Sequence, residues 1–313
     1  MIDLATLHPT DHGQYLIIDC PKCGHHEAYI YKVELEKAKK NPRQKIHYTC
    51  NRQNHCGARG VLDDVSLNSV KMKPVQDFKI GLSEESLKKL DLLYRLNDRI
   101  VGFDFDIRGI SNTVLKENKV CYYPYGFSEL IATSGGMDDK KYQWSVYKER
   151  NIFFPILNEK EKIVRILLRS TKPQEKKEIQ LKTVKNNATE IWNLKDVLDE
   201  NIQVLFLCEG CYDALSVKEA AKQLGRSDIG AISIPGCRKI KKIIKELNSF
   251  NSKRLYVIAT DSDEAGIEAV KTARLEFLKA GKPSKVFNLN GFKDVNDFLL
   301  GNKKLFLKEI SRY

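Results

Sequence analysis

Four acidic residues in the carboxy-terminal third have a spacing that suits the binding of divalent metal ions. Glu209 follows one apolar run and Asp213 comes four residues later, while Asp261 and Asp263 close a second apolar run. Two residues apart on an extended chain, Asp261 and Asp263 point to the same side. Clustered carboxylates repel one another and need a cation, and hard oxygen ligands select magnesium or manganese. The pattern predicts a metal site for phosphoryl or nucleotidyl transfer, the alternative being that these acids only end strands and cap helices.

Four cysteines near the amino terminus form two spaced pairs that suit a structural zinc site. Cys20 and Cys23 lie in CPKCG, and Cys50 and Cys56 lie in YTCNRQNHCGARG. Four thiolates give zinc a closed tetrahedral shell, and the metal would stabilise a domain too small to bury much apolar surface. Nearby histidines are alternative ligands: His25, His26, His47 and, as the most serious rival, His55 beside Cys56.

The other four cysteines are spread over the rest of the chain, at Cys121, Cys208, Cys211 and Cys237. Cys208 and Cys211 make a second C-x-x-C pair. However, Cys208 ends a predicted strand and Cys211 begins the following helix, and the intervening Glu209 already has a role at the acidic site. We therefore expect neither a redox nor a metal function for this pair.

The elements around the acidic residues repeat a regular pattern after Asn201. Apolar strands are predicted within 204–210, 230–236, 254–263 and 285–289, separated by helices within 211–225, 238–248 and 264–281. This alternation predicts a mostly parallel sheet with helices on both faces. Open parallel sheets present their binding crevice at the carboxyl ends of the strands, and this is where Glu209 and Asp261 fall.

The remainder of the chain divides into three segments, which makes the predicted fold class multidomain α/β. Residues 1–66 form a small zinc-ribbon-like domain, and the polar, basic stretch 67–79 is a linker. Residues 80–200 form an irregular α+β unit, with a helix capped by Ser83 and strands in NIFFPIL and KIVRILLRS; the lysine-rich KPQEKKEIQLKTVK is a loop or hairpin. Residues 201–313 form the α/β domain.

The composition favours a polyanionic partner. The 313 residues carry a net charge of +12, with a pI near 9.1, and cations that meet phosphates release condensed counterions. The sequence lacks an apolar run long enough to cross a membrane and a secretory signal at its amino terminus, so we expect a cytoplasmic protein without a membrane role.

Two segments together resemble a known family. CEGCYDALS followed by IATDSDEAGIEAV resembles the TOPRIM signature, a glutamate-glycine and then D-x-D, of primases, topoisomerases and some nucleases. With CPKCG and YTC…HCGARG, the chain is similar to zinc-containing primases of the bacterial DnaG type and to the primase half of phage primase-helicases. The resemblance implies a zinc-binding template-recognition domain at 1–66, the N-terminal subdomain of an RNA polymerase core at 80–200, and a TOPRIM catalytic domain with a helical tail at 201–313.

The same resemblance assigns further residues. DIRGIS and VCYYPYG resemble two segments of the core, and NIFFPILNEKEKIVRILLRS resembles its basic motif. Arg169 then corresponds to the basic-motif arginine and Lys182, with Lys185 as a rival, to a lysine before the TOPRIM domain; Arg169 and Lys182 would hold triphosphate or template phosphate. Asp294, in GFKDVNDFL, becomes a further candidate magnesium or manganese ligand. Asn296 stands where many members have an aspartate, and Leu167-Leu168 replaces a glycine pair.

The implied function is metal-dependent synthesis of short RNA primers on single-stranded DNA, in a primase of phage or mobile-element type. Its partners would be the DNA template and ribonucleoside triphosphates, and its cofactors structural zinc and catalytic magnesium or manganese. The alternatives are a TOPRIM nuclease and a non-catalytic zinc and TOPRIM binding protein. The sequence has no G-x-x-x-x-G-K-[ST] phosphate loop, so a replicative helicase would be a separate chain or a missing carboxy-terminal domain.

Three tyrosines of the zinc domain have two possible uses. Tyr29, Tyr31 and Tyr48 are aromatic residues of the kind that stack on bases in single-strand readers. We expect most of them to pack the small core instead.

Overall fold

The structure is a computed structural model of the chain. It describes residues 2–12, 15–41, 44–52, 56–62, 65–66, 82–95, 105–133, 145–174, 178–182, 191–234, 236, 239–250 and 253–313. Contacts between residues divide the chain into an amino-terminal unit, Met1–Lys79, and a carboxy-terminal unit, Ile80–Tyr313. The proposed linker 67–79 and the residues His55, Lys185 and Cys237 lie outside the described residues.

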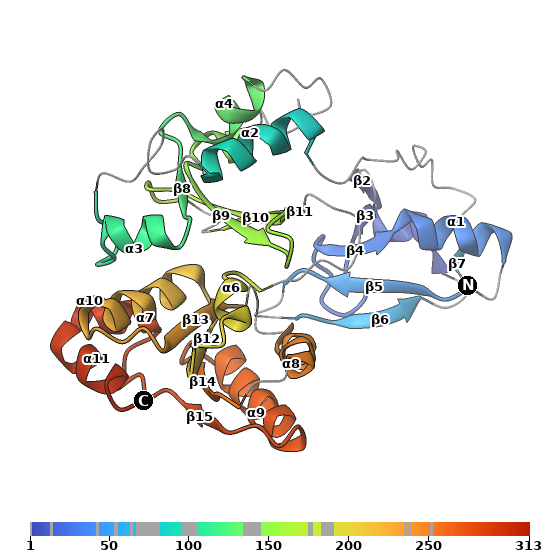
Figure 1. The fold of residues 1–313 in the computed structure, drawn as a ribbon. Coiled ribbons are helices and arrows are strands. Elements are labelled where there is room, and N and C mark those ends of the chain that lie inside the picture. Colours follow the sequence, from blue (N-terminus) through green and yellow to red (C-terminus); the bar gives the residue numbers. More distant parts are fainter. Residues whose placement is uncertain are drawn as a thin grey trace. The chain divides into compact units, whose positions relative to one another are not determined.

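The amino-terminal unit is built on a five-stranded antiparallel sheet with the order β2-β3-β4-β5-β6 (Figure 1). A short parallel pair, β1 and β7, lies beside it. The elements are β1 (Ile2–Asp3), η1 (Leu4–Leu7), β2 (Thr10–His12), β3 (Tyr15–Ile18), β4 (Ala28–Tyr31), α1 (Lys32–Lys40), β5 (Ile46–Cys50), β6 (Arg59–Leu62) and β7 (Val65–Ser66).

Alternation along the strands decides which side chains form the core of this unit. In β3, Leu16 and Ile18 are buried while Tyr15 is exposed, and in β4, Ala28 and Ile30 are buried while Tyr31 is exposed. The buried face packs against Leu35 of α1, and Cys20 and Cys50 belong to the same cluster. A core this small gives a bound metal a large share in stability.

The carboxy-terminal unit contains two sheets. An antiparallel sheet has the order β11-β10-β9-β8 and a parallel sheet has the order β13-β12-β14-β15. The elements are α2 (Glu84–Arg95), α3 (Asn112–Glu117), β8 (Cys121–Tyr122), α4 (Gly126–Ala132), α5 (Ser145–Lys148), β9 (Ile152–Leu157), β10 (Ile163–Arg169), β11 (Ile179–Lys182), α6 (Lys195–Leu198), β12 (Val204–Cys208), α7 (Cys211–Gln223), β13 (Ile229–Ser233), α8 (Ile240–Ser249), β14 (Leu255–Ala259), α9 (Glu264–Lys279), β15 (Ser284–Val286), α10 (Val295–Gly301) and α11 (Lys303–Ile310).

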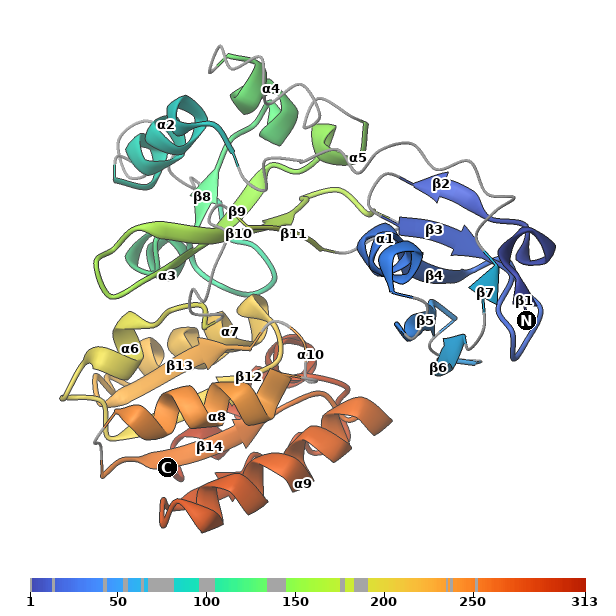
Figure 2. The ribbon, with the colours of Figure 1, turned by 90° about the vertical axis from the view of Figure 1, so that its right-hand side faces the viewer.

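The parallel sheet is covered on both faces, as its continuous apolar strands predict. In β12, Leu205 and Leu207 pack against α8 and α9, whereas Phe206 packs on the opposite face with α7, α10 and α11. Figure 2 shows α8 and α9 in front of this sheet and α7 behind it. The predicted alternation of strands and helices after Asn201 is therefore confirmed.

The two sheets of the carboxy-terminal unit share one core. Ile152, Phe154 and Leu167 of the antiparallel sheet belong to the same buried cluster as Phe206 and Tyr212 of the parallel-sheet domain. Partly buried hydrogen bonds also tie α7 to the segment before α3, because Glu219 of α7 accepts from the backbone N–H and the hydroxyl of Ser111 at 2.9 and 2.7 Å. This shared core fixes the antiparallel sheet against the carboxyl ends of the parallel strands.

The helix expected after Ser83 is present as α2, and the Ser83 hydroxyl accepts from the Ser86 backbone N–H at 3.2 Å. In the lysine-rich segment, 179–182 form the edge strand β11, paired with β10. Of the two predictions for this segment, a loop or a hairpin, the hairpin is confirmed for the described residues.

Candidate metal centres and acidic cavity

The four predicted zinc ligands come together in the amino-terminal unit. The loop between β3 and β4 carries Cys20 and Cys23, and the loop between β5 and β6 carries Cys56, next to Cys50 at the end of β5. All four sulfur atoms lie within 4.8 Å of one another, with 3.9 Å between Cys20 and Cys56 and 3.9 Å between Cys23 and Cys50. A zinc–sulfur bond of about 2.3 Å in a tetrahedron requires sulfur atoms about 3.8 Å apart. The cluster therefore fits a zinc ion.

Local backbone geometry explains why these loops present their sulfur atoms together. Gly24 and Gly57 each follow the second cysteine of a pair and have positive φ values of 71° and 54°, which glycine adopts at little cost. The Gly24 N–H donates to the Cys20 carbonyl oxygen at 2.8 Å and closes the first loop. The glycine after the second cysteine of each pair is thus needed for the backbone conformation, while the cysteines supply the ligands.

The described histidines are engaged elsewhere. The ring of His25 bonds to the Cys23 carbonyl oxygen at 2.9 Å, that of His26 to Asp19 at 2.7 Å, and that of His47 to Glu34 at 3.3 Å. The metal-compatible group found among the described residues contains cysteines only. His25, His26 and His47 do not belong to this group, and His55 lies outside the described residues.

Burial opposes ionisation of Cys50 without a metal. Burial raises the pKa of Cys50 to about 12, a backbone N–H at Arg52 opposes this, and the Cys20, Cys56 and Cys23 thiols add to it. Thiolates are the form that binds zinc, so metal binding there must release protons.

Three tyrosines lie on the outer face of the sheet in the amino-terminal unit, and we call them the tyrosine face: Tyr15, Tyr29 and Tyr31. Tyr15 and Tyr31 are directly opposite in register, and their rings lie 5.8 and 5.7 Å from that of Tyr29. Tyr31 is 47% exposed. The expectation that most of Tyr29, Tyr31 and Tyr48 pack the core is wrong, because strand alternation turns Tyr29 and Tyr31 outward and only Tyr48 of the three packs against the core.

In the carboxy-terminal unit, four of the five predicted acidic residues, all but Asp263, line a cavity of about 410 Å³ that we call the acidic cavity. Glu209 follows β12, Asp261 follows β14, Asp213 lies in the first turn of α7, and Asp294 caps α10. The full lining is Arg108, Phe154, Arg169, Glu178, Glu209, Gly210, Cys211, Tyr212, Asp213, Gly236, Asp261, Lys293, Asp294 and Asp297. The parallel topology brings these side chains to one edge, as expected.

Asp261 shows the electrostatic strain of this arrangement. Its pKa is raised to about 7, first by burial and then by the negative charges of Glu209, Asp294 and Asp263, with Lys293 opposing. Charges that disfavour one another to this degree favour a bound cation. The carboxylates are nevertheless spread out, because among the described residues only the four cysteines offer three or more ligand atoms within 4.8 Å. Magnesium tolerates such spacing, since it keeps several waters and binds through one or two carboxylates plus substrate phosphates.

Asp213 holds the framework of the cavity. Its side chain is 8% exposed and accepts from the Gly210 N–H at 3.1 Å and from the Asn296 N–H at 2.9 Å. Its pKa is raised to about 7 by burial and by Asp294, while these backbone donors oppose the rise. Asp213 thus ties the turn after β12 to the start of α10.

Asp263 has a structural role in addition to its place beside Asp261. Its side chain caps α9 by accepting from the Gly266 N–H at 2.9 Å, and it does not line the acidic cavity. Gly266 permits this close turn, because a Cβ there would lie 2.0 Å from the Asp261 carbonyl oxygen. The D-x-D spacing puts Asp261 and Asp263 at the end of the strand, but one oxygen of Asp263 is used to cap the following helix.

Three cations line the cavity together with the carboxylates. The guanidinium groups of Arg108 and Arg169 lie 4.8 and 5.3 Å from the centre of the Tyr212 ring, and Arg169 is 3.9 Å from a Glu178 oxygen. Burial raises the pKa of the Tyr212 hydroxyl to about 12, so that the ring stays neutral. Lys293 adds a third cation beside Asp261. An anion bound in the cavity would meet all three cations.

The cavity contains residues that the sequence did not single out. Arg108, Lys293, Glu178, Tyr212 and Asp297 line it, and all but Glu178 stand within segments that carried a signal: DIRGIS for Arg108, CEGCYDALS for Tyr212, and GFKDVNDFL for Lys293 and Asp297. Arg169 lies in the cavity as predicted. Lys182 ends β11 opposite Arg165, but its side chain is not among those described.

Cys208 and Cys211 are both buried, at 0% and 4% exposure. Burial raises the pKa of each thiol well above its usual value, with Asp213 among the charges that add to this. Protonated, buried thiols are poor metal ligands and poor nucleophiles, which agrees with the interpretation that this C-x-x-C pair is structural.

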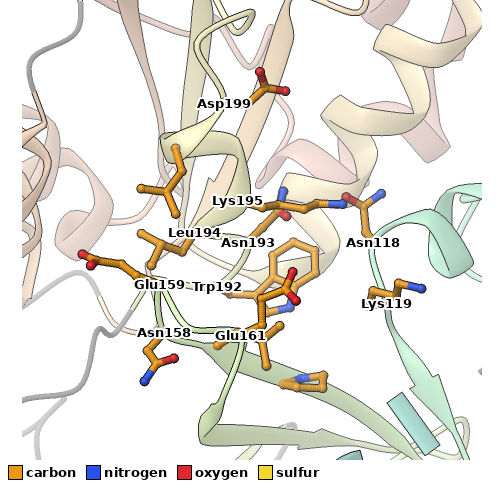
Figure 3. A pocket seen from close by; sticks show the side chains of 13 residues that line it. Asn118, Lys119, Asn158, Glu159, Glu161, Trp192, Asn193, Leu194, Lys195 and Asp199 are labelled. Carbon is orange, nitrogen blue, oxygen red and sulfur yellow. The ribbon is translucent and has the colours of Figure 1, made fainter. Parts of the chain in front are cut away.

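A second cavity of about 340 Å³ lies beside the turn between β9 and β10 (Figure 3). Trp192, Pro155 and Leu157 form an apolar part of its wall, and Asn118 and Lys195 lie at its edge. None of the residues predicted for a functional site lines it. The acidic cavity is therefore the candidate active site.

Comparison with known families agrees with the position of the acidic cavity. Residues 206–299, which supply most of its carboxylates, match the Toprim-like family. This segment is a Toprim-like domain. No curated protein sequence matches the chain.

Solved structures show the fold around the Toprim-like domain. A DnaG primase catalytic domain bound to ssDNA has a TM-score of 0.55 at 15% identity, covering 73% of this chain and 81% of its own. A DnaG catalytic core has a TM-score of 0.54 at 14% identity, covering 72% and 79%. The E. coli primase catalytic core has a TM-score of 0.53 at 16% identity, covering 73% and 79%. The chain therefore contains the fold of a primase catalytic core.

None of the helices within the described residues has the length and the apolar character needed to span a membrane.

Proposed function

We propose that this chain is a DNA primase that joins ribonucleotides on single-stranded DNA in the acidic cavity. The observation that carries this proposal is the juxtaposition, in one cavity, of Glu209, Asp261 and Asp294 of the Toprim-like domain with Arg108 and Arg169 of the preceding segment. Such an arrangement can accept metal ions at its carboxylates and phosphate groups at its guanidinium groups, which is what nucleotidyl transfer requires.

The carboxylates fit magnesium or manganese. Glu209, Asp261 and Asp294 would hold the metal, with the second oxygen of Asp263 as a further ligand, because hard oxygen donors select these ions. Carboxylates outnumber cations in the cavity lining by six to three, so a divalent ion would relieve their repulsion. When bound, the metal would orient the attacking oxygen and neutralise charge on the leaving pyrophosphate.

The protein's own cations would bind the triphosphate. In primer synthesis the 3′ oxygen of one nucleotide attacks the α-phosphorus of the next, the bond to the β-phosphate breaks, and the hydroxyl proton and pyrophosphate leave. Arg108, Arg169 and Lys293 are placed to hold the charged phosphates, and the planar guanidinium groups suit bidentate contacts. Lys182 remains a proposed partner in this role.

The amino-terminal unit would recognise the template. Its zinc, held by Cys20, Cys23, Cys50 and Cys56, would be structural because four cysteines leave no open coordination position. The tyrosine face offers exposed rings on which bases of a single strand can stack. A linker at 67–79 would let this unit approach the catalytic unit during initiation.

Two features of the proposal concern partners. One structure with the same fold is described as bound to ssDNA, and the net charge of +12 suits a polyanion. The absence of a phosphate-loop motif leaves unwinding to a replicative helicase, either a separate chain or a further domain, as in a primase of phage or mobile-element type.

The decisive experiment is primer synthesis by the full chain. The protein is incubated with single-stranded DNA of varied sequence, labelled ribonucleoside triphosphates and magnesium or manganese. Glu209→Gln and Asp261→Asn should each lower synthesis by at least about a hundredfold, because each removes a charge from the metal site. Glu268→Gln is the matched control, since Glu268 is an exposed glutamate of α9 outside the cavity.

The outcomes separate the proposal from its alternatives. Template-dependent RNA products from the wild type and the control, but not from Glu209→Gln, support a primase. Metal-dependent DNA cleavage without added nucleotides would replace it with a Toprim nuclease. DNA binding without either reaction, unchanged in Glu209→Gln, would favour a non-catalytic binding protein.

A further inference from the structure

Arg108 occupies a turn that disfavours its residue type. The backbone N–H groups of Ile107 and Ile110 donate to each other's carbonyl oxygens at 3.1 and 3.0 Å. The two central residues, Arg108 and Gly109, have φ values of 54° and 74°, as in a type I′ turn. That turn favours Asn-Gly, because positive φ is strained for a side chain such as arginine. Something other than turn preference must keep Arg108 in this conformation.

Asn296 supplies the contacts that hold the turn. Its side-chain amide donates to the Arg108 carbonyl oxygen at 3.0 Å and to the Ser216 hydroxyl at 2.9 Å. Its side-chain oxygen accepts from the Arg108 guanidinium at 3.4 Å. Asn296 itself is fixed, because it is 2% exposed and its backbone N–H donates to Asp213. One neutral side chain therefore contacts both the backbone and the charged group of Arg108.

This contact directs Arg108 toward the acidic cavity. The guanidinium group lies over the Tyr212 ring at 4.8 Å, and Arg108 lines the same cavity as the carboxylates. The ring supports the cation without neutralising it. An aspartate at 296 would pair its charge with Arg108, whereas the neutral amide leaves the full positive charge for an anionic ligand.

The same contacts argue against a metal role for Asn296. Its nitrogen and its oxygen are both hydrogen-bonded within the protein, and it does not line the acidic cavity. A residue with its ligand atom turned to a guanidinium group cannot at the same time face a divalent cation.

We propose that Asn296 is a positioning residue that holds Arg108 as a cation for the nucleotide phosphates, and that it is not a metal ligand. This inference rests on the proposed primase function only in naming the nucleotide as the anion. It predicts that Asn296 acts through Arg108. The increase in KM in the double variant should therefore be smaller than the product of the increases in the two single variants.

The test compares Asn296→Ala, Arg108→Ala and the double variant in the full chain. Each single variant should raise the KM for ribonucleoside triphosphate about tenfold with kcat changed less, as expected for loss of one charge-assisted contact. The double variant should resemble Arg108→Ala. Asn302→Ala is the matched control, because Asn302 caps α11 through the Leu305 N–H and lies outside the cavity.

Two binding measurements make the inference independent of primer synthesis. Manganese binding without nucleotide, followed by electron paramagnetic resonance, should be unchanged in Asn296→Ala and weakened in Asp261→Asn. Binding of a fluorescent ATP analogue should weaken in Asn296→Ala. Weakened manganese binding in Asn296→Ala, or effects of the two residues that multiply, would overturn the inference. Binding results as expected, without primer synthesis by the wild type, would reject the primase proposal and keep the positioning role. Asn296→Ser, which retains a small polar group, checks that the protein folds.

Discussion

At the scale of single residues, Asp261 makes the clearest prediction about pH. Its pKa rises from 3.8 to about 7 in the folded protein, mainly through burial and then through Glu209. The folded state then binds a proton more tightly than the unfolded state, so stability falls as pH rises from about 4 to about 7. Without added divalent ions, Asp261→Asn should stabilise the carboxy-terminal unit at pH 8 by about 1 to 2 kcal/mol, less than the full shift implies because water partly reaches the side chain. At pH 4 it should have little effect.

Thermal unfolding followed across this pH range checks the prediction. Asp228→Asn is a control in which the change in stability should have the opposite sign, because the hydrogen bond from Arg226 lowers the pKa of Asp228. That variant should lose stability above about pH 4. Added magnesium should reduce the advantage of Asp261→Asn, and an equal effect of this variant at pH 4 and pH 8 would contradict the electrostatic explanation.

A second residue-level prediction concerns the buried ion pair of the amino-terminal unit. The Lys32 ammonium group donates to both oxygens of Asp11 at 2.6 Å, and Lys32 is 1% exposed while the Asp11 side chain is 24% exposed. Asp11→Ala should cost about 3 kcal/mol because it leaves a buried cation without this carboxylate. Lys32→Met should cost less, since water can reach Asp11. Zinc release on heating, followed with a chromophoric chelator, reports unfolding of the amino-terminal unit. Equal losses of stability in Asp11→Ala and Lys32→Met would contradict this explanation.

Residue types and spacing predicted part of the site. The two spaced cysteine pairs and the acids at strand ends are local signals. From them the sequence predicted the cluster that contains Cys20 and Cys50, and the position of Asp261 at the end of a strand. Arg108 and Lys293 stand within or beside quoted segments, but their place in the cavity depends on tertiary packing, which spacing alone does not encode. The sequence also missed that a helix cap engages Asp263, because a capping aspartate and a metal-binding aspartate look alike before their partners are known.

At the scale of elements, the turn from β14 into α9 decides where Asp261 lies. A Cβ at Gly266 would lie 2.0 Å from the Asp261 carbonyl oxygen. Gly266→Ala should therefore displace Asp261 and destabilise the carboxy-terminal unit by about 2 kcal/mol or more, through backbone strain. Primer synthesis should be lost together with manganese binding.

Gly281→Ala is the matched control for this turn. Gly281 has a φ of 64° but nothing within 4 Å of an added Cβ. It should cost about 1 kcal/mol from backbone conformation alone and leave synthesis unchanged in the folded protein. Full synthesis by Gly266→Ala would show that the turn tolerates more movement than its geometry suggests.

The zinc loops make a prediction at the same scale. Cys50→Ser should remove one of four thiolates and release the zinc, which is expected at about one ion per chain in the wild type. Because the core around Leu16 and Ile30 is small, loss of the metal should unfold β3, β4 and β5. Limited proteolysis should then cut within 2–66. The carboxy-terminal unit has a separate core and should stay protected from the protease. Zinc retained by Cys50→Ser would contradict the proposed set of four ligands.

Elements were more predictable than side chains. The apolar runs that became β12, β13 and β14 are buried on both faces, so their composition is unambiguous. The antiparallel sheet was less readable, because pairing of β8 with β9 and of β10 with β11 joins segments of uneven length. The exposed tyrosine face was misjudged because alternation within four-residue strands such as β3 and β4 is too short to assign a face from sequence alone.

At the scale of the whole molecule, the two units suggest a division of labour between template recognition and chemistry. The amino-terminal unit has exposed aromatic rings and a zinc-compatible cluster, whereas the carboxy-terminal unit has the cations and carboxylates of the acidic cavity. Stacking on rings and contact with phosphates respond differently to salt, because only the second releases counterions. The two contributions can therefore be separated in one titration.

We predict that binding of single-stranded DNA weakens as potassium chloride rises, with a logarithmic slope of about −2 if three cations contact phosphates. Arg169→Ala should flatten that slope by about 0.7, because it removes one phosphate contact. Tyr31→Ala should instead lower affinity about tenfold at every salt concentration and leave the slope unchanged, since stacking displaces no ions. Tyr125→Ala is the control, as Tyr125 is 72% exposed but lies outside the tyrosine face. A change of slope in Tyr31→Ala, or equal losses in Tyr31→Ala and Tyr125→Ala, would remove the tyrosine face from template binding.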